Sequence, residues 1–282
     1  MRFTSFQTNG APTWGVIEGD EVLDLGSVLR DRYPDLKSAI VAGALQQVGE
    51  SASEAPRHKL SAITWLPLIP NPDKILCIGL NYETHRKETG RTEVENPTVF
   101  ARHANSQIGH LANIIRPRVS QDLDFEGEVA VIIGKPGRYI SRDAAWDHIA
   151  GYSLYNDGSV RDFQRHTHQF HPGKNFPNTG ALGPWMVTPD ELGDLGKLRL
   201  QTRVNGQVVQ DALIEQMIFD IPRQIEYCST FTRLEPGDVI ATGTPGGVGA
   251  KRNPPLWLKP GDTVEVELDR LGVLRNGVAD EG

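Results

Sequence analysis

Five consecutive apolar residues, from Val129 to Ile133, are the segment that most constrains the fold of this chain. A short uninterrupted apolar run is typical of a buried strand. Glu126 and Glu128 lead directly into it, and side chains two residues apart on a strand point to the same face. The two carboxylates repel each other unless a positive charge lies between them. The segment therefore indicates either a cation at the mouth of a buried strand or a strand that starts in solvent.

The chain beyond about residue 74 predicts mostly β structure. Asn205-Gly206 is a strong hairpin signal, and Pro-Gly-Asp at 236–238 and 260–262 feeds a strand each time, which suits a rolled-up β structure. Helical periodicity is clearest at 81–90 and 215–231. Candidate strands lie at 74–79, 97–103, 128–134, 149–157, 181–188, 198–206, 238–243 and 263–269.

Residues 1–70 predict a separate small domain of two or three short strands and a helix. Gly19-Asp20 is typical of a hairpin between two of these strands. The polar span 46–60 and the proline-rich span 67–74 are typical of a linker and a boundary. We therefore expect two domains, 1–70 and 71–282.

Composition excludes several classes of function. The 29 Lys and Arg against 36 Asp and Glu give a net charge of −7, and no dense basic run indicates a nucleic-acid partner. No apolar run approaches the ~20 residues that span a bilayer, so we expect a soluble protein. Cys77 and Cys228 make no disulfide framework, and Cys77 lies in an apolar run that favours a buried residue over a reactive thiol. Without a signal peptide, the expected location is the cytoplasm.

A third carboxylate strengthens the metal interpretation. Asp157 ends a predicted strand beside a turn, a common position for metal ligands, although turn chemistry alone also explains Asn-Asp-Gly. With Glu126 and Glu128 it makes an all-oxygen ligand set, which suits Mg²⁺, Mn²⁺ or Ca²⁺ better than zinc.

His85 and Glu88 are three residues apart in a segment of helical periodicity. At that spacing the carboxylate can accept a hydrogen bond from the imidazole and raise its basicity, as in a general base that activates water. The alternative is an exposed helix of mixed charge.

Other polar segments are less decisive. Lys174 lies in a Gly/Pro/Asn-rich loop where its charge could hold a carbonyl or carboxylate oxygen, and Arg161 could bind a carboxylate or pair with a nearby acid. The glycine-rich run 241–251 lacks the spacing of a phosphate loop but predicts a backbone nest for an anion. A polar surface loop is a better interpretation than zinc for the histidines at positions 166, 168 and 171.

Six segments, in this order, resemble the fumarylacetoacetate hydrolase family: "IGLNYETHRKETG", "PTVFARHANSQIGH", "DFEGEVAVIIG", "GYSLYNDGSVRDFQ", "GKNFPNTGALGPW" and "LEPGDVIATGTPGGVG". The resemblance covers roughly residues 70–275. It implies an α+β protein that is mostly β, with a rolled mixed β-sheet and a small N-terminal domain, commonly as a homodimer. Two segments depart from the family pattern: Arg102 and His103 replace Lys-Pro, and 177–179 replace Asp-Thr-Phe.

The resemblance also implies roles for individual residues. The three acids would bind Mg²⁺ or Mn²⁺, with Ca²⁺ as a further ion in crystals, and His85 with Glu88 would activate water. Lys174 would act in catalysis by stabilising charge on an oxygen. The 2-oxo acid end of a small-molecule substrate would be held by Arg161, Gln164 and Thr244.

The reaction expected from this resemblance is hydrolysis of a C–C bond in an acylpyruvate-type 2,4-dioxo acid, which yields a 2-oxo acid and a carboxylic acid. Decarboxylation of a compound such as oxaloacetate, isomerisation and dehydration of a 2-oxo acid are alternatives that use the same metal site. A non-catalytic binding protein would be expected to have lost the metal ligands or the His–Glu pair, and all five positions are filled.

Overall fold

The computed structural model describes residues 1–50 and 54–282. Its main sheet has twelve strands, in the order β4-β3-β2-β1-β14-β12-β11-β17-β6-β7, with β5 beside β1 and β8 beside β14. A second sheet has the order β16-β15-β18-β19-β9, and β10 pairs with β13. The predicted class, mostly β with α, is confirmed. No helix within the described part of the chain is long and apolar enough to cross a membrane.

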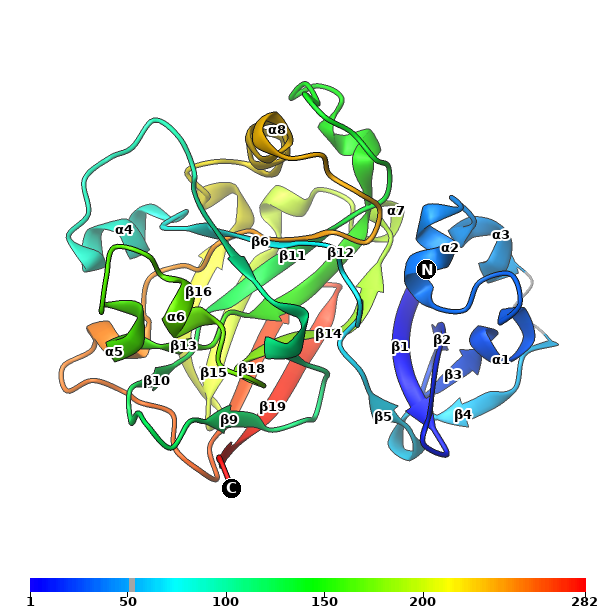
Figure 1. The fold of residues 1–282 in the computed structure, drawn as a ribbon, viewed down its shortest axis with the longest axis horizontal. Helices are drawn as coiled ribbons and strands as arrows, with labels where there is room; N and C mark the ends of the chain where they lie inside the picture. Colours follow the sequence, from blue (N-terminus) through cyan, green and yellow to red (C-terminus); the bar gives the residue numbers. More distant parts are fainter. Residues whose placement is uncertain (51–53) are drawn as a thin grey trace.

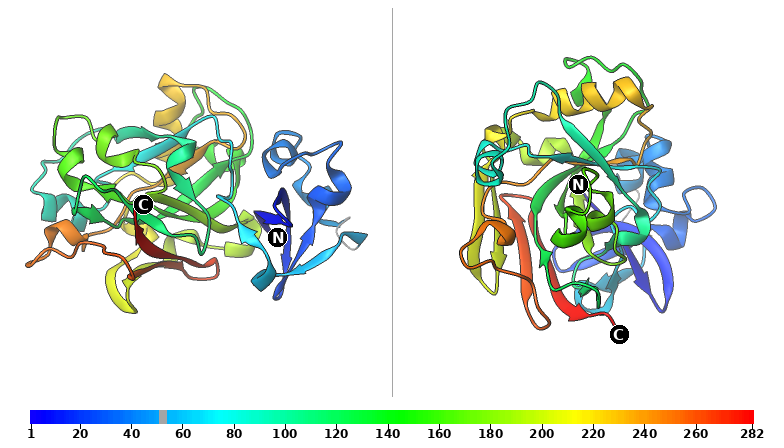
Figure 2. Two further views of the ribbon diagram at one scale, coloured as in Figure 1. Left: turned by 60° about the horizontal axis from the view of Figure 1, so that its bottom comes forward. Right: turned by 60° about the vertical axis from the view of Figure 1, so that its left-hand side comes forward.

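The N-terminal strands and helices lie to one side of the molecule, at the right in Figure 1 and in the left panel of Figure 2. They join the rest through β1, which pairs antiparallel with β14 and so continues the main sheet. The elements are β1 (Arg2–Thr8), β2 (Ala11–Glu18), β3 (Glu21–Asp24), α1 (Leu25–Leu29), α2 (Leu36–Val41), α3 (Leu45–Glu50), β4 (Arg57–Lys59) and β5 (Thr64–Trp65). The division into domains at residue 70 stays a prediction.

The expected linker at 46–60 is wrong for most of its length. Its first residues belong to α3, and Arg57–Lys59 form β4, whose backbone pairs with β3. Polar composition misled here because an edge strand keeps charged side chains in solvent while its backbone is paired. The remaining part at 51–53 lies outside the described residues.

The remaining strands fall into two groups. Those of the main sheet are β6 (Ile75–Gly79), β7 (Thr98–Arg102), β8 (Gln107–Ile108), β11 (Gly127–Ile133), β12 (Ile149–Asn156), β14 (Gly180–Val187) and β17 (Val239–Ala241). Those outside it are β9 (Ile114–Arg116), β10 (Leu123–Asp124), β13 (Ser159–Val160), β15 (Arg199–Val204), β16 (Gln207–Leu213), β18 (Thr263–Leu268) and β19 (Gly272–Asp280). Every predicted strand is present in whole or in part.

The later helices are α4 (Glu83–Thr89), α5 (Arg161–Gln164), α6 (His171–Lys174), α7 (Pro189–Leu192) and α8 (Ile221–Phe231). Helical periodicity from residue 215 predicted a longer α8. The helix starts later because the Asp220 side chain caps it by accepting from the Arg223 N–H, and Pro222 occupies its first turn.

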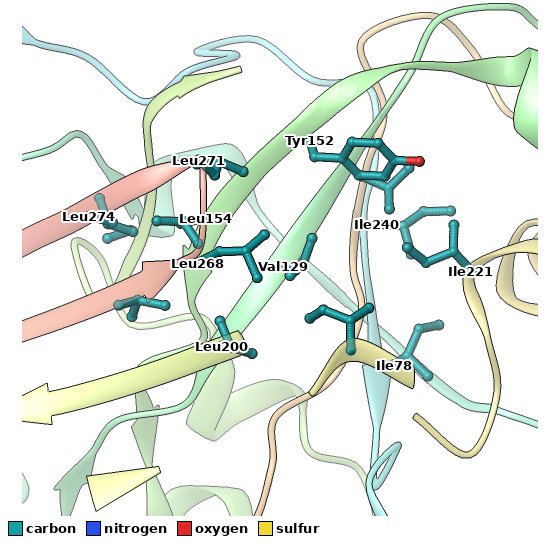
Figure 3. Close-up of a cluster of buried hydrophobic side chains, with 14 of the residues drawn as sticks. Ile78, Val129, Tyr152, Leu154, Leu200, Ile221, Ile240, Leu268, Leu271 and Leu274 are labelled. Atoms are coloured by element: carbon teal, nitrogen blue, oxygen red, sulfur yellow. The ribbon is translucent and has the colours of Figure 1, made fainter. Parts of the chain in front are cut away.

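The second sheet packs across β11 and β12 of the main sheet, as a layer of yellow to red strands (Figure 2, right). Val129 and Leu154 from the main sheet meet Leu200, Leu268 and Leu274 from the second one (Figure 3). On its opposite face β11 contributes Ala130 and Ile132 to another core cluster, which includes N-terminal residues. Because β11 is buried on both faces, its sequence is apolar without alternation.

Gly127 lies where the second sheet closely approaches the start of β11. A Cβ atom at this position would be 2.0 Å from Oγ1 of Thr202 on β15 and 3.2 Å from the Val266 side chain on β18. Only glycine allows the second sheet to approach the first residue of β11 this closely. The close neighbours of this glycine are therefore the side chains of β15 and β18.

Candidate metal centre and active site

The three acids predicted as metal ligands converge. Glu126 precedes β11, Glu128 is its second residue, and Asp157 directly follows β12. The ladder between β11 and β12 pairs Gly127 with Asn156, which brings the acids side by side. All three are buried, and one carboxylate oxygen from each lies within 4.8 Å of the other two. A single ion could therefore contact all three residues.

The positive charge expected beside the acids is Lys174, at the end of α6. Its Nζ lies 2.7 Å from Oε2 of Glu126 and 2.7 Å from Oδ2 of Asp157. Burial favours the neutral amine, but attraction to Asp157 and Glu126 outweighs burial, so the pKa of Lys174 is raised. The ammonium group therefore bridges Glu126 and Asp157, whereas the strand spacing had suggested a cation between Glu126 and Glu128.

Two buried arginines pair with the same acids. Nη2 of Arg161 lies 2.6 Å from Oε1 of Glu126, and Nη1 of Arg102 lies 2.5 Å from Oδ1 of Asp157. Arg161 also pairs with Asp124 at 2.8 Å. Sequence reasoning noted Arg102 only as a departure from the family pattern and missed Asp124. The signal for Asp124 was its position two residues before Glu126, on the same side of an extended chain.

Glu128 lacks such a counter-charge. Within the described part of the chain it forms no ion pair, and its Oε2 accepts one hydrogen bond, from the Gly243 N–H at 2.9 Å. Burial and the neighbouring Asp157 and Glu126 raise the pKa of Glu128 well above its usual range. A buried carboxylate with no ion-pair partner among the described residues, facing two other acids, fits an ion bound by oxygen ligands. The residues present therefore fit a divalent metal ion.

His85 and Glu88 form the predicted pair on α4. Nδ1 of His85 lies 2.7 Å from Oε1 of Glu88, and Oε2 of Glu88 accepts from the Gly247 N–H at 2.9 Å. This arrangement leaves Nε2 of His85 available as a base. His85 is buried and lies close enough to Glu126 to affect its pKa. The exposed-helix alternative is wrong for His85.

A cavity of about 810 Å³ brings these groups together. His85 lines it while Glu88 does not, so Glu88 lies behind the imidazole, where it can orient the ring. All of the other predicted site residues line this cavity, namely Glu126, Glu128, Asp157, Arg161, Gln164, Lys174 and Thr244.

The glycine-rich run does hold anions, but they belong to the chain itself. The N–H groups of Gly243 and Gly247 donate to Glu128 and Glu88. Thr244 donates its hydroxyl hydrogen to the carbonyl of Gly127 at 3.0 Å, so that hydrogen is not free for a substrate. This segment therefore holds the acidic strand and α4 in fixed positions.

The histidines of the loop after α5 have different positions. His166 and His168 are exposed and line the cavity, whereas His171 begins α6 and contacts His103, with 3.2 Å between their Nε2 atoms. Among the described residues no cluster of three metal-binding side chains includes a histidine. Their exposure agrees with the prediction of a polar surface loop.

The chain is similar to known enzymes over most of its length. Residues 74–279 match the family model described as fumarylacetoacetate (FAA) hydrolase, C-terminal. A mitochondrial oxaloacetate tautomerase of Bos taurus, FAHD2A, is 42% identical over 80% of this chain and 73% of its own length.

Two solved structures cover this chain and their own chains completely. A fumarylacetoacetate hydrolase from psychrophilic Exiguobacterium antarcticum has 33% identity and a TM-score of 0.87. A maleylpyruvate hydrolase from Sphingobium sp. SYK-6, in complex with manganese(II) and pyruvate, has 26% identity and a TM-score of 0.83. The family model matches residues 74–279, which is most of the chain. The chain therefore belongs to the fumarylacetoacetate hydrolase family.

Proposed function

We propose that this enzyme binds a 2-oxo acid and catalyses its keto–enol tautomerisation, with oxaloacetate as the substrate to test first. One observation carries the proposal: a buried ammonium group, three convergent carboxylates and the free nitrogen of a buried imidazole line one cavity. The similarity to an oxaloacetate tautomerase supports the choice of substrate. Tautomerisation requires one proton to leave C3 and one to reach the oxygen on C2.

Glu126, Glu128 and Asp157 would hold a divalent ion, Mg²⁺ or Mn²⁺. Such an ion supplies Lewis acidity to the oxygens of a 2-oxo acid, which acidifies the neighbouring C–H bond. The metal-bearing structure of a related hydrolase supports this proposal, although it contains manganese.

Lys174 and Arg161 would stabilise the oxygen that becomes negative. The Lys174 ammonium is fully buried and fixed by two acids, so little reorganisation is needed when charge develops nearby. Nη2 of Arg161 is buried and lies 2.6 Å from Oε1 of Glu126, so the guanidinium charge is held beside the first of the metal-ligand glutamates. Gln164 accepts from Nη1 of Arg161 at 2.8 Å and fixes the guanidinium plane.

His85 would move the proton. Its Nδ1 faces Glu88, so Nε2 is the nitrogen that can accept the proton from C3. Glu88 is itself fixed by the Gly247 N–H, and it favours the protonated imidazole that forms. From the keto form the proton passes from C3 to the oxygen on C2, and from the enol form it passes from that oxygen to C3.

The His85–Glu88 pair also favours a second candidate, hydrolysis of an acylpyruvate. There the imidazole would deprotonate a water molecule that attacks the distal carbonyl, and the C–C bond would break to give a 2-oxo acid and a carboxylic acid. Decarboxylation, isomerisation and dehydration need no attacking water. The homodimer and the cytoplasmic location expected from the sequence remain proposals.

The test is product analysis with enol-oxaloacetate and with a 2,4-dioxo acid, each with Mg²⁺, with Mn²⁺ and with a chelator. A tautomerase accelerates the loss of enol absorbance beyond the rate in protein-free buffer containing the same metal, and no carbon is lost. A hydrolase releases one carboxylic acid for each dioxo acid consumed, and a decarboxylase releases CO₂. If neither compound reacts faster than in the protein-free control, the proposed function is wrong.

A further inference from the structure

Gln210 connects strand β11, which carries the metal-ligand glutamates, to the loop that contacts Glu88, although Gln210 does not line the cavity. It belongs to β16, at the edge of the second sheet, and its side chain is buried. Its Oε1 accepts from the Gly127 N–H at 2.9 Å, and its Nε2 donates to Oγ1 of Thr244 at 2.7 Å and to the Pro245 carbonyl at 2.8 Å.

These contacts close a ring around the peptide groups of Gly127. Thr244 donates to the carbonyl of Gly127, and Gln210 accepts from its N–H. On this side β11 pairs with β17 only from Ala130 to Ile132, so none of the described strands pairs with the peptide groups of Gly127 here. The amide and the hydroxyl take the place of that strand. The side chains held by this ring are those on either side of Gly127, Glu126 and Glu128.

The same amide fixes the loop from Gly243 to Gly247. The loop starts with the N–H that donates to Glu128 and ends with the N–H that donates to Glu88. Gln210 holds its middle, at Thr244 and Pro245. One side chain therefore connects the strand that carries two metal ligands to the loop that orients the His85–Glu88 pair.

We propose that Gln210 is a positioning residue that sets the two metal-ligand glutamates of β11 against the His85–Glu88 pair. It does not line the cavity, so it would act through Gly127 and Thr244. Its effect on metal binding follows from the geometry of the acids, whereas its effect on turnover also rests on the function proposed above. Loss of the amide would free the end of β11 and the loop from each other.

Two variants test this role. Gln210→Met keeps the length of the side chain and removes all three hydrogen bonds. Gln210→Glu keeps the acceptor for the Gly127 N–H and removes the amide donors to Thr244 and Pro245. A carboxylate at this position would by charge alone attract a cation, so weaker metal binding in this variant has to come from geometry.

Two control variants are matched to them. Asn276→Leu removes another buried amide of the second sheet, which donates to the carbonyls of Gly109 and Ala112 and does not line the cavity. Gln207→Met changes an exposed glutamine on the same strand as Gln210. Asn276→Leu controls for the stability that is lost when a buried amide is removed. Gln207→Met controls for the replacement of a glutamine by methionine on the same strand.

The readouts are the Mn²⁺ dissociation constant, from electron paramagnetic resonance of the free ion well below each Tm, and kcat and KM for the substrate. Both Gln210 variants should weaken Mn²⁺ binding at least tenfold and lower kcat more than they raise KM. Asn276→Leu should lower Tm but leave the Mn²⁺ constant within about twofold of wild type. Gln210 variants whose Mn²⁺ constant and kcat match those of Asn276→Leu would overturn the proposal. Weakened Mn²⁺ binding with no substrate turned over by wild type would support the positioning role and contradict the proposed function.

Discussion

Lys174 lies 2.7 Å from Glu126, so the first glutamate of the acidic pair is neutralised by the chain itself while the second is not. Glu126 also contacts Arg161, and attraction to Lys174 and Arg161 outweighs burial to keep its pKa low. Among the described residues, Glu128 forms no ion pair and accepts a hydrogen bond only from the Gly243 N–H. Two carboxylates that the sequence presents as equivalent therefore differ in what they require from a bound ion.

Replacing each glutamate by glutamine should affect the stability of the metal-free protein differently. Glu126→Gln breaks two buried ion pairs, but Lys174 keeps Asp157 and Arg161 keeps Asp124, so it should lower the free energy of unfolding by about 1–3 kcal/mol. Glu128→Gln removes a carboxylate without a counter-charge and should leave the metal-free protein at least as stable as wild type. Urea unfolding in the presence of a chelator measures both.

The same variants test metal binding. Wild type should gain Tm on addition of Mg²⁺ or Mn²⁺, by an amount that grows with ion concentration. Both variants should lose this gain. A wild-type Tm that does not respond to either ion would contradict the metal centre, and an intact response in Glu128→Gln would remove that residue from the ligand set.

Gly127→Ala should force the two sheets apart. The new Cβ would meet Oγ1 of Thr202, and overpacking of a filled core typically costs about 1–3 kcal/mol. Thr202→Ala removes the atom in conflict. The double variant should therefore be destabilised by less than the sum of the two single variants, measured by chemical unfolding. Additive losses would show that the contact with Thr202 does not explain why glycine is needed at position 127.

Stability should fall between pH 6.5 and 4 because of His110. Burial and the neighbouring Arg275 lower the pKa of His110 from 6.5 to about 4, and its Nδ1 accepts from the Arg275 N–H at 3.0 Å. The unfolded chain takes up a proton in this range and the folded protein does not. The stabilisation is therefore complete above about pH 6.5 and is lost as the pH falls towards 4, by on the order of 1–3 kcal/mol.

His110→Gln provides the comparison for that pH dependence. Glutamine can accept from the same N–H but does not take up a proton, so unfolding free energies of the variant should fall less steeply from pH 6.5 to 4.5. Equal slopes for the variant and wild type would assign the pH dependence to other groups.

Three cations at the cavity should make turnover of dianions sensitive to salt. Arg91, Arg165 and Lys251 line the cavity and are exposed, and in the described part of the chain none of them forms an ion pair with an acidic side chain. Unpaired charges of one sign attract oppositely charged ligands until salt screens them, with a Debye length of about 10 Å at 0.1 M. We expect kcat/KM for a dianionic substrate to fall several-fold with added salt.

Arg165→Gln should reduce both kcat/KM and its dependence on salt, mainly through KM. Lys197→Gln is the matched control, because Lys197 is exposed, pairs with Asp194 and does not line the cavity. A monoanionic acylpyruvate should respond less to salt than a dianion. The same salt dependence in wild type and in Arg165→Gln would remove this arginine from substrate attraction.

Local spacing was enough to find much of the candidate site. Glu126 and Glu128 precede a continuous apolar run, Asp157 follows another strand, and His85 and Glu88 are one helical turn apart. Hairpin turns such as Asn205-Gly206 could be predicted equally well from the sequence, because the left-handed conformation of both residues restricts the choice of amino acid. Wherever the relevant contact lies within a few residues, its geometry follows from the strand or helix alone.

The chain's own counter-charges and supports could be read only from the tertiary structure. Lys174 reaches Glu126 across 48 residues, and Gln210 reaches Gly127 across 83. Neither contact follows from periodicity, since each depends on which strands pair and on how closely the second sheet approaches the first. The sequence by itself determined which carboxylates share a strand face. Their partners depend on packing, because a buried charge or peptide group is satisfied by whatever the folded chain brings within about 3 Å of it.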